Sequence, residues 1–284
     1  MKRIGYLGPR GTFSEEAARA YTASGSSASG ETRLCPYRSI PEILSAVDTG
    51  DADLGIVPIE NSIQGPETLT VDVLVHDVEL SIRGEIVIAV THNLLARPGA
   101  RLEDIREVYS HPQALAQCRL SLNRRLPWAV TKTASSTAEA AKIAADSLQD
   151  QGVGALGTEL AARIYGLSVL APRLEDVEGN ATRFVVIGRD DALPTGKDKT
   201  SIVFSTLTDR PGVLHEILGE FASRHINLTK IESRPARRTL GEYIFLIDLE
   251  GHRTDPSIGE ALDRVKAASG YFRVLGSYPR GQRT

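Results

Sequence analysis

A charged segment that contains proline and glycine, residues 190–199, divides the chain into two parts with different sequence patterns. The segment has no hydrophobic periodicity, which is typical of a linker between domains. After it, the residues predict strand, helix, two strands, helix and strand. This β-α-β-β-α-β order predicts a ferredoxin-like α+β unit. We therefore expect a large domain over residues 1–189 and a small one over residues 200–284.

Four predicted strand-to-helix turns in the large part carry Ser or Thr where the helix begins, near residues 12, 110, 135 and 158. One such turn is most simply an ordinary capped helix. Four together are typical of a cleft lined by helix N-termini, whose free N–H groups and dipoles favour anions. We therefore expect an α/β domain of two lobes, with the second lobe over roughly residues 80–170.

Polar side chains follow the predicted strand at residues 54–57, among them Glu60, Asn61 and Ser62. Open α/β sheets bind ligands at the carboxyl ends of their strands, so these side chains could form a ligand site. The same residues could instead form a hydrogen-bonded turn between two strands. Composition alone does not separate these two interpretations.

A hydroxyl and a guanidinium, Thr182 and Arg183, stand at the entrance of the apolar run 184–188. Neither group suits a hydrophobic core, so this segment caps another element or contacts a ligand. We predict that both side chains face a small anionic substrate.

Charge and motif content exclude several classes of function. The net charge is -3 and aromatic residues make up only 5% of the chain, which argues against a nucleic-acid partner. Cys35 and Cys118 stand far apart, and no metal-ligand spacing occurs. The apolar run at residues 86–90 is too short to span a bilayer, and the first nine residues lack the pattern of a signal peptide. These features predict a cytoplasmic protein with no membrane partner.

Motifs along nearly the whole chain resemble those of prephenate dehydratases with a C-terminal ACT domain. They occur, in the order and spacing of the family, at residues 8–14 (GPRGTFS), 57–62 (VPIENS), 110–117 (SHPQALAQ), 182–184 (TRF), 209–215 (DRPGVLH) and 232–235 (ESRP). Each motif alone is weak evidence, and the set of six is specific.

The resemblance implies a periplasmic-binding-protein-like catalytic domain that converts prephenate to phenylpyruvate, with loss of water and carbon dioxide, without a cofactor. It implies that Thr182 stabilises the departing hydroxyl, that Asn61, Ser110 and Gln117 orient the ring and hydroxyl, and that Glu60 positions rather than titrates. The residues implied to bind substrate are Thr12, Phe13, Ser14, Ser62, Arg183 and Phe184.

For the ACT domain, the resemblance implies that phenylalanine binds as an allosteric effector between paired domains. The residues implied are Gly212, Val213, Leu214, Asn227, Glu232, Ser233, Arg234 and Pro235. The open edges of ferredoxin-like sheets favour pairing, so we expect a homodimer or homotetramer. A purely structural dimerisation domain is the alternative.

Two positions depart from the family pattern: Pro66-Glu67 replace a small residue followed by an apolar one, and Val213 stands where alanine is frequent. No chorismate mutase segment precedes Met1, so we expect the monofunctional form. Arogenate dehydratase and a non-catalytic amino-acid sensor are the alternative functions. A DNA-binding regulator would need a helix-turn-helix and a basic face, and the sequence has neither.

Overall fold

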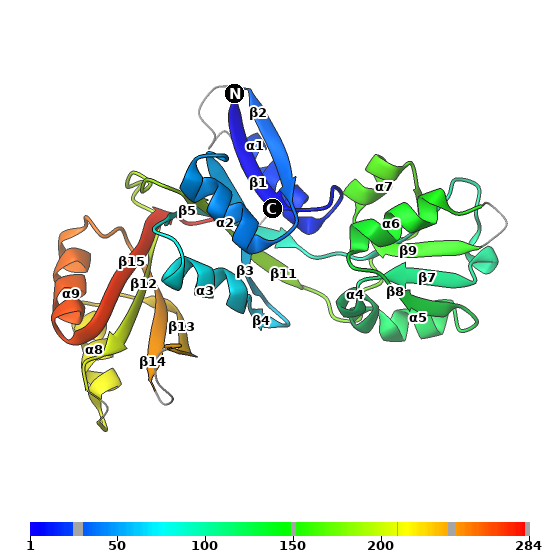
Figure 1. Ribbon diagram of the computed structural model, residues 1–284. Coiled ribbons are helices and arrows are strands. Elements are labelled where there is room, and N and C mark those ends of the chain that lie inside the picture. The colour runs from blue at the N-terminus through cyan, green and yellow to red at the C-terminus, as the bar shows by residue number, and fades with distance from the viewer. Residues whose placement is uncertain (25–30, 149–151, 209, 238–241, 282–284) are drawn as a thin grey trace.

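The computed structural model describes residues 1–24, 31–148, 152–208, 210–237 and 242–281, which form two lobes and a C-terminal domain. Figure 1 shows the first lobe in the middle, with the second lobe on one side and the C-terminal domain on the other. The two-lobed α/β domain and the ferredoxin-like domain predicted from the sequence are both confirmed. Asp209, the first residue of the predicted DRPGVLH motif, lies outside the described residues.

The first lobe is a mixed sheet covered by helices on both faces, and its strands run in the order β2-β1-β3-β11-β5, with β4 paired to β3. Its elements are β1 (Lys2–Leu7), α1 (Phe13–Ala23), β2 (Thr32–Tyr37), α2 (Ile40–Thr49), β3 (Leu54–Asn61), β4 (Gly65–Pro66), α3 (Thr68–His76), β5 (Ser81–Ala89) and the returning β11 (Ala181–Gly188). Strand β11 is antiparallel to both β3 and β5. The chain thus leaves the first lobe after β5 and returns to the centre of its sheet.

The second lobe is built on a sheet with the order β10-β6-β9-β7-β8. Its elements are β6 (Asn93–Ala96), the 3₁₀ turn η1 (Leu102–Asp104), β7 (Glu107–Ser110), α4 (Pro112–Gln117), α5 (Arg119–Arg125), β8 (Val130–Thr133), α6 (Thr137–Asp146), β9 (Val153–Gly157), α7 (Glu159–Tyr165) and β10 (Ser168–Ala171).

The helix caps agree with the sequence at α1, α6 and α7, where Thr12, Ser136 and Thr158 accept a hydrogen bond from a backbone N–H of the first turn. The cap of α4 differs. There His111 is the N-cap, and Ser110 is the last residue of β7. The strand simply continues one residue further than the capping pattern suggested.

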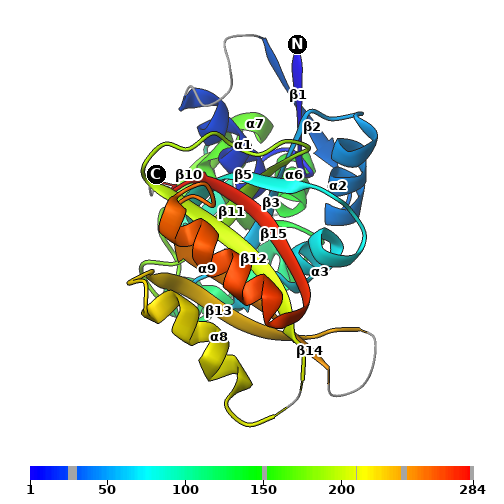
Figure 2. The same cartoon turned by 90° about the vertical axis from the view of Figure 1, so that its left-hand side faces the viewer.

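The C-terminal domain is an antiparallel sheet, β13-β14-β12-β15, with both helices on its outer face (Figure 2). Its elements are β12 (Asp198–Thr206), α8 (Val213–Ala222), β13 (Leu228–Pro235), β14 (Tyr243–Glu250), α9 (Pro256–Ala267) and β15 (Ser269–Pro279). Strand β12 begins at Asp198, so the last two residues of the predicted linker belong to the sheet.

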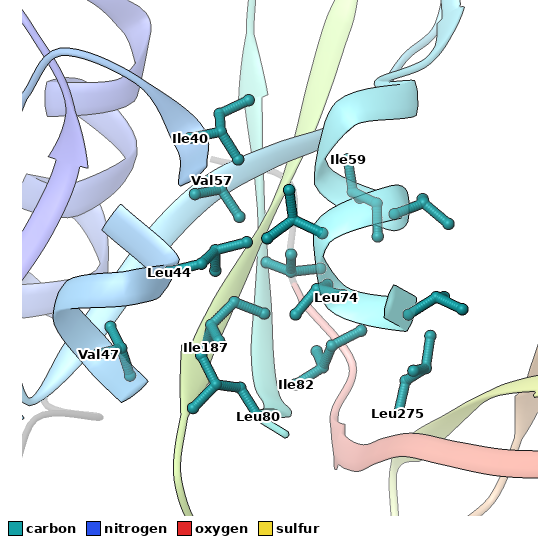
Figure 3. Packing of buried hydrophobic residues seen from close by; sticks show 14 of the residues in the cluster. Ile40, Leu44, Val47, Val57, Ile59, Leu74, Leu80, Ile82, Ile187 and Leu275 are labelled. Atoms are coloured by element: carbon teal, nitrogen blue, oxygen red, sulfur yellow. The ribbon is translucent and has the colours of Figure 1, made fainter. Parts of the chain in front are cut away.

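The inner face of this sheet shares one hydrophobic cluster with the first lobe. Leu275 of β15 packs in the same cluster as Leu74 of α3 and Ile82 of β5 (Figure 3). Gly276 lies so close to β5 that a Cβ there would stand 2.2 Å from the carbonyl oxygen of Ile82, and its φ is 153°. Because the shared surface is apolar and tightly packed, the C-terminal domain is fixed against the first lobe rather than loosely tethered.

Candidate active site

A cleft of about 850 Å³ lies between the two lobes. The first lobe contributes the turn from β1 into α1, the end of β3 and residues of β11, and the second lobe contributes the starts of α4 and α6. The predicted residues that line this cleft are Thr12, Phe13, Ser14, Glu60, Asn61, Gln117, Thr182 and Phe184. The cleft is also lined by residues 135–137 at the predicted helix start near residue 135, by His111 and Gln113 of the 110–117 motif, and by Arg38 and His92, which the sequence did not suggest.

The cleft is suited to an anion. Helices α1 and α6 begin at its wall, and a helix start carries partial positive charge. Among the described residues that line it, Arg38 supplies the one guanidinium. These groups are the candidate partners of substrate carboxylates.

Thr182 belongs to a chain of side-chain hydrogen bonds that crosses the cleft. Antiparallel pairing of β11 with β3 places Thr182 opposite Asn61, and the Asn61 Nδ2 donates to Thr182 Oγ1 at 2.9 Å. The same Nδ2 is 2.9 Å from Asn180 Oδ1, and Asn180 Nδ2 is 3.2 Å from Gln117 Oε1. His92 Nε2 is 2.9 Å from that same Gln117 oxygen. Thr182, Asn61 and Gln117, far apart in sequence, are therefore brought together by the fold.

Two members of this chain were not predicted to be site residues. Asn180 precedes the TRF motif by two positions, so its place in the sequence could have suggested a role. His92 follows an apolar strand and belongs to no motif, and only the fold brings it to the cleft.

The position of Arg183 contradicts the prediction that its side chain faces the substrate. Successive side chains of a strand point to opposite sides, so Thr182 faces the cleft and Arg183 points away from it. Its side chain is 10% exposed, and its guanidinium lies 2.7 Å from Asp248 of β14 and 3.2 Å from Glu85 of β5. Burial alone would lower the pKa of Arg183, but the carboxylates of Asp248 and Glu85 outweigh it and raise that pKa.

Glu60 stands at the rim of the cleft, with its side chain 40% exposed. Its carboxylate is 3.4 Å from Arg183 Nε and 3.7 Å from Lys230 Nζ, which belongs to β13 of the C-terminal domain. These two cations orient the carboxylate, and through Lys230 they connect the cleft to the C-terminal domain.

Ser110 and Ser62 are absent from the residues that line the cleft. Ser110 is fully buried and donates a hydrogen bond to the carbonyl oxygen of Leu156 at 2.9 Å. Ser62 Oγ accepts a hydrogen bond from the backbone N–H of Ala181 at 3.0 Å. Direct contact of either hydroxyl with a ligand in the cleft, as predicted, is not supported by this geometry.

A second cavity of about 750 Å³ lies in the C-terminal domain and reaches the first lobe. Three of the predicted effector residues line it, namely Gly212, Val213 and Leu214, and so do Val75 and His76 of α3. The other predicted effector residues, Asn227, Glu232, Ser233, Arg234 and Pro235, do not line it.

Glu232 and Arg234 instead face the first lobe, because residues two apart in a strand share one side. Arg234 Nη2 is 2.7 Å from Asp72 of α3, and Glu232 lies 3.2 Å from Lys230 and 3.3 Å from Arg234. In this chain Arg234 joins the C-terminal domain to α3, and Glu232 pairs with Arg234 and Lys230 of its own strand.

The described residues hold no group of three or more His, Cys, Asp or Glu side chains arranged for a metal ion. None of the helices in the described ranges is long and apolar enough to cross a membrane.

Comparison with known proteins gives matches over almost the entire chain. Residues 4–192 match the prephenate dehydratase family, and residues 200–267 match the ACT domain family. A prephenate dehydratase of Methanocaldococcus jannaschii is 40% identical over 280 residues, which cover 98% of each chain.

Solved structures agree with these matches. The prephenate dehydratase of Arthrobacter aurescens in complex with L-Phe superposes with a TM-score of 0.87 at 40% identity, covering 98% of this chain and 90% of that one. GqqA, described as a novel type of quorum quenching acylase, superposes with a TM-score of 0.84 at 29% identity, covering 98% of both chains. Because the second of these is described as an acylase, the fold alone does not identify the reaction, and the residues of the cleft must be considered.

Proposed function

This chain belongs to the prephenate dehydratase family and contains an ACT domain over residues 200–267, and on that basis we propose that its cleft converts prephenate to phenylpyruvate in phenylalanine biosynthesis. The family match over residues 4–192 and the relative from Methanocaldococcus jannaschii support this reaction. In it, the bond between the ring and its carboxylate breaks and carbon dioxide is released, the electron pair of that bond enters the ring, and the hydroxyl on the opposite ring carbon leaves and takes up a proton from solvent to become water. Formation of an aromatic ring drives the process. The enzyme therefore has to bind a dianion, align the two breaking bonds and help the hydroxyl leave.

The direction of the hydrogen bond between Asn61 and Thr182 carries the mechanistic part of this proposal. Asn61 Oδ1 accepts from the backbone N–H groups of Ile63 and Gln64, each at 3.0 Å, so its Nδ2 must be the atom that faces Thr182. Thr182 Oγ1 is then an acceptor, and its own proton has no protein acceptor within the described part of the chain. That proton is available for the departing hydroxyl of the substrate.

Thr182 acts in this proposal as a hydrogen-bond donor to the leaving oxygen rather than as a strong acid. A threonine hydroxyl is a very weak acid, so full proton transfer from it is unfavourable. Accepting a hydrogen bond from Asn61 polarises the hydroxyl and makes it a better donor. The stabilisation is largest when negative charge develops on the leaving oxygen, which is where donation accelerates the reaction.

We assign the substrate carboxylates to Arg38 and to the N–H groups at the starts of α1 and α6, since these are the positive groups of the cleft lining. Arg183 is not given this role, because it is paired with Asp248 and Glu85. Glu60 lies at the rim, where its negative charge would repel a dianionic substrate unless the carboxylate stays paired with Arg183 and Lys230.

For the C-terminal domain we propose phenylalanine as the effector, bound near Gly212, Val213 and Leu214. The Arthrobacter relative, whose structure contains L-Phe, supports this proposal. Strand β13 lies at the edge of its sheet, which supports association of two copies as a homodimer or homotetramer. A cytoplasmic location is proposed from the biosynthetic role of the family.

The test is turnover of prephenate by the purified protein, followed as phenylpyruvate, with arogenate assayed beside it. Thr182→Ala removes the donor and is expected to lower kcat about 100-fold or more. Thr182→Ser keeps the hydroxyl and is the matched control, expected to keep kcat within about tenfold. Turnover of prephenate by Thr182→Ala close to that of the parent enzyme would contradict the role given to Thr182. A preference of the parent enzyme for arogenate would contradict prephenate as the substrate.

A further inference from the structure

We propose that His92 is a positioning residue for this dehydration, because its Nε2–H group sets the orientation of the Gln117 amide in the cleft. This inference rests on the proposed function. It concerns a side chain from the segment that connects the two lobes, between β5 and β6.

The orientation of each amide follows in turn from backbone groups whose chemistry is fixed. A backbone N–H can only donate, so the Asn61 atom that accepts hydrogen bonds from the N–H groups of Ile63 and Gln64 is its oxygen. Asn61 therefore presents its NH₂ group to Asn180, and the Asn180 atom 2.9 Å away is its oxygen.

The same reasoning extends to the second lobe. Since the Asn180 oxygen faces Asn61, its NH₂ group faces Gln117, and the Gln117 atom at 3.2 Å is the amide oxygen. That oxygen is also the atom 2.9 Å from His92 Nε2. An oxygen acceptor needs a donor, so the proton of the imidazole is on Nε2.

The consequence for the cleft is that the Gln117 amide group is held in one orientation. Its oxygen is held by His92 and Asn180, so its NH₂ group is directed elsewhere. No described residue accepts a hydrogen bond from that NH₂ group, and Gln117 lines the cleft. Gln117 therefore offers two N–H donors to a substrate oxygen, in addition to the Thr182 hydroxyl.

The surroundings of His92 hold its ring in one place. The side chain is 3% exposed and meets the Phe13 ring edge-on, with 5.7 Å between the ring centres. Its backbone N–H donates to Glu175 at 2.9 Å. Nδ1 is buried and without a hydrogen-bond partner, as expected for the ring nitrogen that carries no proton. Burial also lowers the pKa of His92, which favours the neutral ring at neutral pH.

The chain of hydrogen bonds joins groups from both lobes and from both connections between them. Asn61 lies in the first lobe, Gln117 in the second, and His92 and Asn180 in the two connecting segments. Removing His92 therefore leaves the Gln117 oxygen with the Asn180 NH₂ group, at 3.2 Å, as its one remaining donor among the described residues, and this weakens the restraint that keeps the Gln117 NH₂ group directed at the substrate.

The test compares two substitutions of His92 that differ in one property. His92→Phe keeps an aromatic ring and removes the donor, and it is expected to lower kcat by about 10- to 100-fold while KM changes less than about threefold. His92→Gln can place an amide N–H near the position of Nε2, and it is expected to recover kcat to within about fivefold of the parent. Circular dichroism and thermal unfolding establish that each variant is folded.

A measurement that needs no turnover is the tautomer of His92 in the unsubstituted protein. Nitrogen-15 NMR distinguishes an imidazole protonated on Nε2 from one protonated on Nδ1, and we expect the Nε2–H form. The Nδ1–H form would overturn the inference, as would unchanged kcat in a folded His92→Phe or equal losses in the two variants. If His92→Phe does not fold, the kcat of His92→Gln and the tautomer of His92 in the unsubstituted protein test the inference. Failure of the unsubstituted protein to act on prephenate would refute the proposed function, while the tautomer would still test the hydrogen-bond chain.

Discussion

Replacing Arg183 by methionine separates a structural role from a substrate-binding one. The Arg183 side chain is 10% exposed, and methionine keeps much of its apolar stem while removing the guanidinium that lies between Asp248 and Glu85. Glu85 keeps Lys199 at 3.0 Å, so it remains paired. Asp248, whose side chain is 2% exposed, keeps only the hydrogen bond from Ser201 at 2.6 Å among the described residues, and loses its cation.

The expected cost follows from that unpaired carboxylate. Removing one partner of a buried ion pair destabilises a protein by about 3–5 kcal/mol, because the other charge stays buried without compensation. Arg183→Met should lower the free energy of unfolding by this amount, measured from urea-induced unfolding by circular dichroism. Asp248→Asn added to Arg183→Met removes the unpaired charge, so the double variant should be more stable than the single one by about 1–3 kcal/mol.

Arg38→Met is the matched control, since Arg38 lines the cleft. It should raise KM for prephenate with little change in stability, because a charge that contacts the substrate contributes to binding rather than to folding. The reasoning about Arg183 is refuted if Arg183→Met raises KM while its free energy of unfolding stays within about 1 kcal/mol of the parent. That result would show that Arg183 contributes to substrate binding rather than to stability.

Two further predictions concern packing and pH. Gly276→Ala should lower the thermal midpoint by several degrees, since its Cβ would meet the Ile82 carbonyl oxygen at 2.2 Å, whereas Gly219→Ala, where no atom lies within 4 Å, should leave the midpoint unchanged or raise it. An equal effect of the two substitutions would contradict the close approach of β15 to β5. Burial lowers the pKa of His92 in the folded protein, so the unfolded chain takes up a proton first and stability should fall as the pH drops below ~6.5. His92→Gln should show a smaller decrease in the urea midpoint between about pH 7 and about pH 5, and an unchanged decrease would show that other groups cause it.

Much of the fold could be predicted because each element carries its own local signal. Alternating apolar residues, capping residues and the change of pattern after residue 189 are all local, and they predicted the order of strands and helices. Thr182, Asn61 and Gln117 could be predicted as one site only through the family resemblance, since nothing local shows that β11 returns to pair with β3.

The error over Arg183 could have been avoided from the sequence. Three consecutive residues of a strand cannot all face one side, so Thr182, Arg183 and Phe184 could not all contact the same ligand. The sequence does not show that the C-terminal domain covers the other side of β11. Both sides of β11 are buried, with Phe184 and Val186 in the cluster that contains residues of α1 and with Val185 and Ile187 in the cluster shared with the C-terminal domain, and no local pattern shows on which side a charged residue finds its partners. His92 has no sequence signal of any kind, because its role depends on the tautomer that three amides from other segments select.

The contacts of α3 connect the two cavities more directly than the linker does. Glu67, the residue that precedes α3, lines the cleft between the lobes, whereas Val75 and His76 at its other end line the cavity of the C-terminal domain. The helix is held by Arg234, which pairs with Asp72, and by Arg273, which donates to the carbonyl oxygen of Leu74 in the helix and to those of Val78 and Leu80 in the segment that follows it. A helix fixed in this way moves as a unit, because its packed side chains resist local deformation. A ligand that displaces one end of α3 is therefore expected to displace the wall of the cleft at the other.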